Sequence, residues 1–199
     1  MMNRSALIFS RLNRTNQGVI YRTSGALDVA VIGNGFFILN NNGFREYTRF
    51  GQFETDSSGY LTDNCGRKVV GFLSDNTGRA TGAMGDIQLP NNYLAVNIDQ
   101  GGLISVRLPH QVSPVTIGSI ALADFVYKTG LRQDPIETTI FTETVSSGVA
   151  KVSEPSTSSF GRLYQGYLEN VSYFGYGVYE PEVRNVNANP SIGITYRGQ

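Results

Sequence analysis

The residue types that most often carry catalysis are scarce in this chain. Of its 199 residues, one is a histidine, His110, and one is a cysteine, Cys65. A cysteine–histidine pair needs one of each and is arithmetically possible, but Cys65 lies in the turn sequence Asp63-Asn64-Cys65-Gly66, whose residue types already explain it. A zinc site would need several imidazoles or thiolates. The sequence therefore predicts no catalytic residue, no metal site and no cofactor.

Two other patterns resemble chemical motifs only in part. Gly33-Asn34-Gly35 begins like a phosphate-binding loop but continues Phe36-Phe37, without the third glycine and the helix that such a loop needs. We interpret it as a hairpin turn. The scattered aspartates lie near Gly, Ser or Asn and mark turns. A pair of carboxylates for glycan hydrolysis could be assembled from such loops, which leaves a glycan hydrolase as an alternative to a protein without an active site.

The charge content excludes further classes of function. The 16 basic and 16 acidic residues cancel, and charged residues make up only 16% of the chain, against roughly 25% in an average soluble domain. A net charge of zero provides no electrostatic footprint for nucleic acid. The sequence has no apolar run long enough to insert in a membrane and no apolar stretch of a secretory signal. A weakly charged chain with 11 Tyr and 11 Phe is typical of a protein that its neighbours cover.

The sequence predicts short strands separated by turns as the elements that position the residues named above. Asn-Gly and Asp-x-x-Gly sequences recur between β-branched and aromatic stretches, and their spacing favours a mainly β, antiparallel, hairpin-rich body of the sandwich or barrel kind. Only the first dozen residues and residues 120–127 would tolerate a helical turn, and residues 146–161 form a Ser-rich loop. The predicted strands are residues 27–32, 36–40, 44–50, 60–62, 67–73, 86–89, 94–98, 103–108, 115–126 and 137–145.

Several spaced motifs resemble those of bacterial flagellar hook and rod proteins. Residues 24–37 read SGALDVAVIGNGFF, similar to the family's G-x-x-L-D-V-A-I-x-G-x-G-F-F, and residues 47–61 are similar to its Y-T-R-x-G-x-F-x-x-D-x-x-G-Y-L. Residues 117–125, IGSIALADF, keep the family's order, and residues 161–169 read GRLYQGYLE and resemble its closing G-x-L-x-Q-G-x-L-E. The matching positions, which the resemblance makes structural rather than catalytic, are Leu27, Asp28, Gly33, Gly35, Phe36, Phe37, Tyr47, Thr48, Arg49, Gly51, Phe53, Gly59, Tyr60, Gly118, Phe125, Gly161, Gln165, Gly166, Leu168 and Glu169.

The resemblance, which covers roughly residues 23–170, implies a fold and a kind of partner. It implies a β-rich body of the hook and rod D1 type, packed into a tubular axial assembly, with no active site and no cofactor. The partners would be copies of the chain itself, in a ring or helical homo-oligomer, and other proteins of the same assembly. The family's long terminal helices, which line its tube, have no counterpart in this sequence: residues 1–22 are too short, and residues 171–199 carry two prolines and no heptads.

These differences lead us to expect three parts in the chain and one kind of assembly that contains it. We expect an N-terminal arm (1–22), a hook- and rod-like β body (23–170) and an aromatic C-terminal arm (171–199). The candidate contact residues of the last arm are Tyr173, Phe174, Tyr176, Tyr179 and Tyr196. Because the flagellar helices are missing from the sequence, we expect a structural subunit of a bacteriophage tail or baseplate, located in the virion. The alternative is a divergent flagellar rod or hook protein of the basal body.

Overall fold

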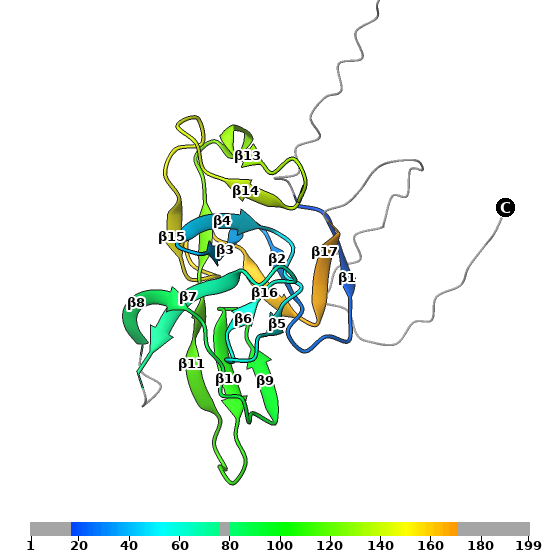
Figure 1. Ribbon diagram of the computed structural model, residues 1–199, viewed down its shortest axis with the longest axis vertical. Coiled ribbons are helices and arrows are strands. Elements are labelled where there is room, and N and C mark those ends of the chain that lie inside the picture. Colours follow the sequence, from blue (N-terminus) through cyan, green and yellow to red (C-terminus); the bar gives the residue numbers. More distant parts are fainter. Residues whose placement is uncertain (1–16, 76–79, 171–199) are drawn as a thin grey trace, which may run out of the picture.

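The computed structural model describes residues 17–75 and 80–170, which form a mainly β body (Figure 1). All strand pairs in this part of the chain are antiparallel, and its one helical turn is η1 (Lys128–Gly130). The strands are β1 (Val19–Arg22), β2 (Val29–Ile32), β3 (Phe36–Asn41), β4 (Phe44–Thr48), β5 (Glu54–Thr55), β6 (Leu61–Thr62), β7 (Lys68–Ser74), β8 (Ala80–Asp86), β9 (Ala95–Ile98), β10 (Leu103–Arg107), β11 (Val115–Ile120), β12 (Leu122–Asp124), β13 (Arg132–Gln133), β14 (Ile140–Thr142), β15 (Lys151–Ser153), β16 (Arg162–Gln165) and β17 (Tyr167–Asn170).

One large curled sheet and two separate ribbons build the body. The main path of the sheet runs β13-β14-β4-β3-β7-β11-β10-β9, and the remaining short strands pair along its sides. The ribbons are β1–β17 and β2–β16. In Figure 1 the β1–β17 ribbon lies along one side of the body, β13 and β14 lie at one end, and β9, β10 and β11 extend toward the other. The predicted antiparallel, mainly β fold is confirmed.

The central strand β3 is buried on both faces of the sheet. Its sequence, Phe-Phe-Ile-Leu, is continuously apolar because successive side chains point to opposite faces. Phe37 and Leu39 belong to one core cluster, which also holds residues of β2, β7 and β10. Phe36 and Ile38 belong to a second cluster, with Phe125 and Phe141. Ring centroids of Phe36 lie 6.0 Å from Phe125 and 5.7 Å from Phe141, in edge-to-face contacts that favour this packing.

The turn sequences explain most of the hairpins. Asn42 and Gly43, both with positive φ, form the two-residue turn between β3 and β4, as predicted for an Asn-Gly pair. Three Asp-x-x-Gly turns share one geometry, in which the aspartate oxygen Oδ1 accepts the backbone N–H four residues on. The distance is 2.9 Å in each, for Asp56, Asp63 and Asp99. These aspartates therefore act as turn formers.

The predicted hairpin turn at Gly33-Asn34-Gly35 is wrong. Both glycines have positive φ, 103° and 127°, but the strands on either side do not pair with each other. β2 pairs with β16, and β3 pairs with β4, β7 and β12. The turn therefore carries the chain from a ribbon into the large sheet, and long-range contacts decide its partners.

Three further strand predictions and one loop prediction need correction. Residues 115–126 form two strands, because β11 pairs with β7 and β10 whereas β12 pairs with β3 and β15. Residues 137–145 contain only β14, because Asp134 holds a turn before it and Thr144 holds another after it. The loop expected at 146–161 contains β15. In 86–89, Asp86 is the last residue of β8 and pairs with Val70, and Gln88 forms a single bridge with Tyr60.

Candidate functional site

The two ends of the described chain meet in the β1–β17 ribbon. Val19 pairs with Asn170 and Arg22 pairs with Tyr167, so the segments before residue 17 and after residue 170 attach to the body at one place. β1 falls within the residues expected to form the N-terminal arm, and the structure pairs it with the last strand of the body. This ribbon is the candidate functional site because a subunit of an assembly must direct its terminal segments from such a point.

Arg49 anchors the ribbon to the rest of the body. Its side chain is 2% exposed, its guanidinium donates four hydrogen bonds, and Nη2 also lies at ion-pair distance from Glu169. Nε and Nη2 reach Oε2 of Glu169 at 2.8 and 2.7 Å. Nη1 donates to the carbonyls of Gly33 and Gly35, both at 2.7 Å, and Nη2 donates to the carbonyl of Val31 at 2.9 Å. These hydrogen bonds and the ion pair offset the cost of removing the guanidinium from water.

The other oxygen of Glu169 reaches the N-terminal side of the same ribbon. Oε1 accepts the backbone N–H of Gly18. The neighbouring Gln17 donates from Nε2 to the Val31 carbonyl at 3.0 Å, and its Oε1 accepts the Gly33 N–H at 2.8 Å. One network of charge-assisted and amide hydrogen bonds therefore joins both chain ends to the 33–35 turn. No motif pointed to Gln17 or Gly18, and no local sequence signal could have found them.

Glycines allow the backbone to approach closely around this junction. A Cβ at Gly161 would lie 2.4 Å from the Ile32 carbonyl oxygen, and one at Gly51 would lie 2.0 Å from that of Val29. Gly35, with positive φ, faces the Leu122 side chain. The backbone N–H of Gly161 donates to the Asn34 carbonyl at 2.7 Å. Side chains at these positions would push the ribbons away from the 33–35 turn.

Gln165 joins the β2–β16 ribbon to the edge of the large sheet. Its Oε1 accepts the Ile98 N–H at 3.0 Å, and its Nε2 donates to the carbonyls of Val96 and Ala26, at 3.1 and 2.6 Å. The side-chain amide thus bonds the outer edge of β9 as a strand would. Next to it, the Gly166 N–H donates to the Asp28 carbonyl at 2.7 Å.

The remaining motif residues lie elsewhere in the body. Phe37, Phe53 and Leu27 belong to the first core cluster or pack on it, and Phe36, Tyr47 and Phe125 form part of the second. Burial raises the pKa of Tyr47 to about 12, assisted by the nearby Glu143 carboxylate. The other positions support turns and strands: Thr48, Gly59, Tyr60, Gly118 and Leu168. The structural roles expected of the whole set stay predictions. Tyr173, Phe174, Tyr176, Tyr179 and Tyr196 lie outside the described residues.

The arrangement around Cys65 does not support thiol catalysis. Its Sγ–H donates to Glu137 Oε1 at 3.2 Å, and this hydrogen bond raises the pKa of the thiol, the opposite of an activated thiolate. His110 lies on an exposed turn after β10 with φ of 63°. Among residues 17–75 and 80–170, no group of three or more His, Cys, Asp or Glu side chains could hold a metal ion.

A second charged cluster surrounds Arg67, which no predicted motif included. Its Nε lies 2.7 Å from Asp63 Oδ2, and its Nη1 contacts Glu46 and Glu137. Burial lowers the pKa of Arg67, but the hydrogen bonds to Asp63 and Glu137 outweigh burial and leave that pKa raised, while the pKa of Glu137 is lowered by the same contact. The i,i+4 spacing of Asp63 and Arg67 was the available signal. The cluster ties the turn at 63–66 to the loop before β14.

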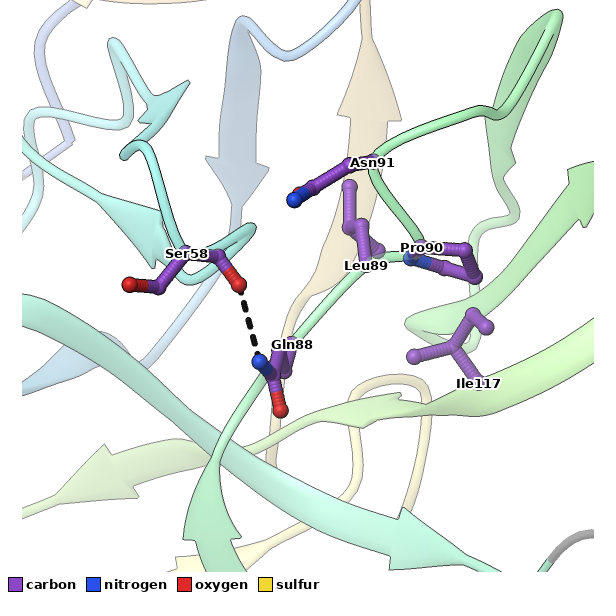
Figure 2. Close-up of a pocket in the computed structure, with 6 residues that line it drawn as sticks. All are labelled: Ser58, Gln88, Leu89, Pro90, Asn91 and Ile117. Carbon is purple, nitrogen blue, oxygen red and sulfur yellow. Dashed lines mark hydrogen bonds between the residues drawn. The ribbon is translucent and has the colours of Figure 1, made fainter.

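One pocket of the described body is lined by amide, hydroxyl and aliphatic groups. Figure 2 shows this pocket of about 310 Å³, in which Gln88 Nε2 donates to the Ser58 carbonyl at 2.8 Å. Leu89, Pro90, Asn91 and Ile117 complete its lining. The Ser58 hydroxyl is the one group of this lining that could act as a nucleophile, and the lining includes no histidine or carboxylate that would activate it. The part of the chain that the structure describes also holds no helix with the length and apolar character needed to cross a membrane.

Comparison with known proteins finds similarity to proteins of the bacterial flagellum. Residues 30–106, which include Arg49 and the 33–35 turn, match the family described as flagellar hook protein FlgE/F/G D1 domain. The flagellar basal-body rod protein FlgG of Buchnera aphidicola subsp. Baizongia pistaciae is 34% identical over 77% of this chain and 54% of that protein. FlgG of Caulobacter vibrioides is 34% identical over 78% of this chain and 53% of that protein, and FlgG of Borreliella burgdorferi is 33% identical over 78% and 55%.

These findings correct the expected function. The prediction of a bacteriophage tail or baseplate subunit, located in the virion, is wrong, because the relatives over about three quarters of the chain are named flagellar basal-body rod proteins. The prediction rested on missing terminal helices, and the chain spans about half the length of the relatives it matches. The length of a sequence does not show which assembly contains its domain. Flagellar rod proteins are structural and form no enzyme class. Both comparisons are to flagellar axial proteins, and the described body is mainly β and antiparallel, with residues 30–106 similar to the FlgE/F/G D1 domain.

Proposed function

We propose that this chain is a structural subunit of the flagellar basal body, in its rod or the adjoining hook, and that it packs with copies of itself and with other axial proteins. The observation that carries the proposal is the similarity to flagellar basal-body rod proteins over about three quarters of the chain. The chemistry of the body agrees with it. The site that the motif residues build is a junction of buried hydrogen bonds, and the pockets of the body present polar and apolar side chains to a partner.

The geometry of the junction supports this role. An axial subunit must hold its terminal segments in a fixed direction relative to its body, since those segments and the body contact different neighbours. The Arg49–Glu169 pair and Gln17 fix both ends to the 33–35 turn. Within the proposal, residues 23–170 act as the body and residues 1–22 and 171–199 as its two arms, with β1 attaching the first arm. The net charge of zero permits close packing of many copies because their fields do not repel.

Isolated basal bodies test the proposal. Hook–basal bodies would be purified from the organism that encodes the chain and labelled with gold-conjugated antibody raised against the full chain. Label along the rod or the proximal hook, and no label on basal bodies from a strain without the gene, is the expected result. Basal bodies that contain all their axial parts but neither bind the antibody nor yield peptides of this chain by mass spectrometry would overturn it.

A further inference from the structure

A groove of about 420 Å³ lies beside the junction, between the 33–35 turn and the loop that precedes β16. Its lining includes Gly33, Asn34, Ser159, Phe160, Arg162 and Tyr164. Arg49 holds the Gly33 carbonyl from beneath, at 2.7 Å. The groove therefore shares a wall with the network that fixes both chain ends.

The two walls of the groove are held together by specific bonds. The backbone carbonyl of Asn34 accepts a hydrogen bond from the Gly161 N–H at 2.7 Å. The Asn34 side chain donates from Nδ2 to the Ser159 carbonyl at 3.3 Å, and its Oδ1 accepts a hydrogen bond from Lys128 Nζ at 2.8 Å. Ser158, beside Ser159, has φ of 45°, a left-handed conformation that a non-glycine residue adopts at some cost. Specific hydrogen bonds of the fold thus hold the groove in its shape.

The lining has the composition of a surface that binds another polypeptide. Small polar residues adapt their hydrogen bonds to a partner, and half-buried aromatic rings such as Phe160 and Tyr164 offer rigid contact area at low cost in conformational entropy. Arg162 is exposed, and within the described ranges no carboxylate lies at ion-pair distance from its guanidinium. The groove therefore favours an aromatic segment with a negative charge.

The charges of the chain's own two terminal segments distinguish between them as candidate occupants of the groove. Residues 1–16 contain Arg4, Arg11 and Arg14 and no acidic residue, so Arg162 disfavours them. Residues 171–183 read VSYFGYGVYEPEV, with four aromatic side chains, two glutamates and no basic residue. Their composition complements the groove in both respects.

We propose that the groove of one copy binds residues 171–183 of a second copy, with the aromatic side chains in the groove and Glu180 or Glu182 facing Arg162. This rests on the proposed function, in which copies are neighbours. The described chain ends at Asn170, which pairs with Val19 in the β1–β17 ribbon, whereas the groove lies beside the β2–β16 ribbon. A tail on one copy and a groove on the next form a heterologous contact, which propagates along a ring or a helix.

Disulfide trapping in the full chain tests the contact directly. Cys65→Ser removes the native thiol, and Ser159→Cys with Gly177→Cys places one thiol in the groove and one in the tail. The matched control replaces Ser159→Cys by Asn91→Cys, in the pocket of Figure 2. After mild oxidation we expect a ladder of covalent dimers and larger species, about tenfold above the control, because docking raises the effective concentration of the two thiols. Equal cross-linking in both pairs, or a cross-link confined to monomers, overturns the proposal.

Charge reversal adds a test that a folding defect would not satisfy. Arg162→Glu in the trapping background should lower the yield of cross-linked species about fivefold, the scale of one ion pair at an interface. Adding Glu180→Arg and Glu182→Arg should restore it, whereas Arg107→Glu, at an exposed position of β10, which extends toward the other end of the body (Figure 1), should change nothing. Failure of the restoring variant to recover the yield would contradict the proposal.

The two proposals fail in different ways. Cross-links in purified protein together with basal bodies that lack the chain would refute the flagellar function and leave the contact standing. Antibody label on the rod together with absent cross-links would refute the contact alone.

Discussion

Arg49 and Glu169 lie 120 positions apart in the chain and form a buried ion pair, with Nη2 of the arginine 2.7 Å from Oε2 of the glutamate. The exposed fractions of the two side chains are 2% and 1%. The same guanidinium bonds three backbone carbonyls of β2 and the following turn, so the pair connects the last strand of the body to the point where the chain enters the large sheet.

Replacing Arg49 by methionine should lower the free energy of unfolding by about 3–5 kcal/mol, because it leaves the Glu169 carboxylate buried without its partner. Urea unfolding followed by circular dichroism measures the change. The double variant Arg49→Met/Glu169→Leu should lose less than the sum of the two single variants. A loss below about 1 kcal/mol for Arg49→Met, no larger than expected for an exposed charge, would show that the pair does not hold the junction.

Replacing Gly161 by alanine should destabilise the body, because the new Cβ would lie 2.4 Å from the backbone oxygen of Ile32. We expect a loss of about 1–3 kcal/mol in thermal or urea unfolding, the usual cost of overpacking. Gly101→Ala is the control, since its Cβ meets nothing closer than 3.4 Å, and it should stay within about 0.5 kcal/mol of the wild type. Equal stability of the two variants would exclude close approach of the turn and β16.

Replacing Gln165 by leucine should expose the edge of β9. The Ile98 N–H and the Val96 carbonyl lose their partner, and an unsatisfied buried group costs about 1–3 kcal/mol. Hydrogen exchange at the Ile98 amide should accelerate markedly. With Gln165→Glu, which keeps an acceptor for Ile98 but no donor for Val96, the amide should retain more of its protection. Unchanged exchange in the leucine variant would mean that another group protects this edge.

Replacing Tyr47 by phenylalanine should change how stability depends on pH. The pKa of Tyr47 is raised from 10.0 to about 12 in the folded chain, so its contribution is fully present below pH 10 and is lost as the pH rises through the folded value. The stability of the wild type relative to Tyr47→Phe should therefore be constant below pH 10 and fall above it, on the order of 2 kcal/mol by pH 12. Parallel pH profiles of the two proteins would contradict the burial of a protonated phenol.

Local sequence signals predicted those parts of the fold that depend on local chemistry. The Asn42-Gly43 turn formed its hairpin because two residues with positive φ are enough to define it. The strands at β7, β9 and β10 matched to within about two residues, since their apolar patterns reflect which faces are buried. The aspartates of the Asp-x-x-Gly turns were likewise assigned to turns.

Contacts between distant residues could not be predicted in this way. The Gly33–Gly35 turn has the local chemistry of a hairpin, yet Arg49 and the pairing of β16 make it a connection between sheets. Arg49 and Glu169 were both recognised as motif residues, but one unaligned sequence does not show that they pair. Two of the strands that were not predicted, β15 and β16, carry too few apolar residues for a periodic signal, and they form because β12 and β2 offer them edges.

The central claim, that this chain is a flagellar axial subunit, is tested most directly by cryo-electron microscopy of isolated hook–basal bodies. We predict that the antiparallel body of residues 17–170, with its β1–β17 ribbon, fits repeated density in the rod or the proximal hook. That density should be absent from basal bodies of a strain that lacks the gene. A map in which other proteins account for all axial density, with no peptides of this chain in the same particles, would contradict the claim.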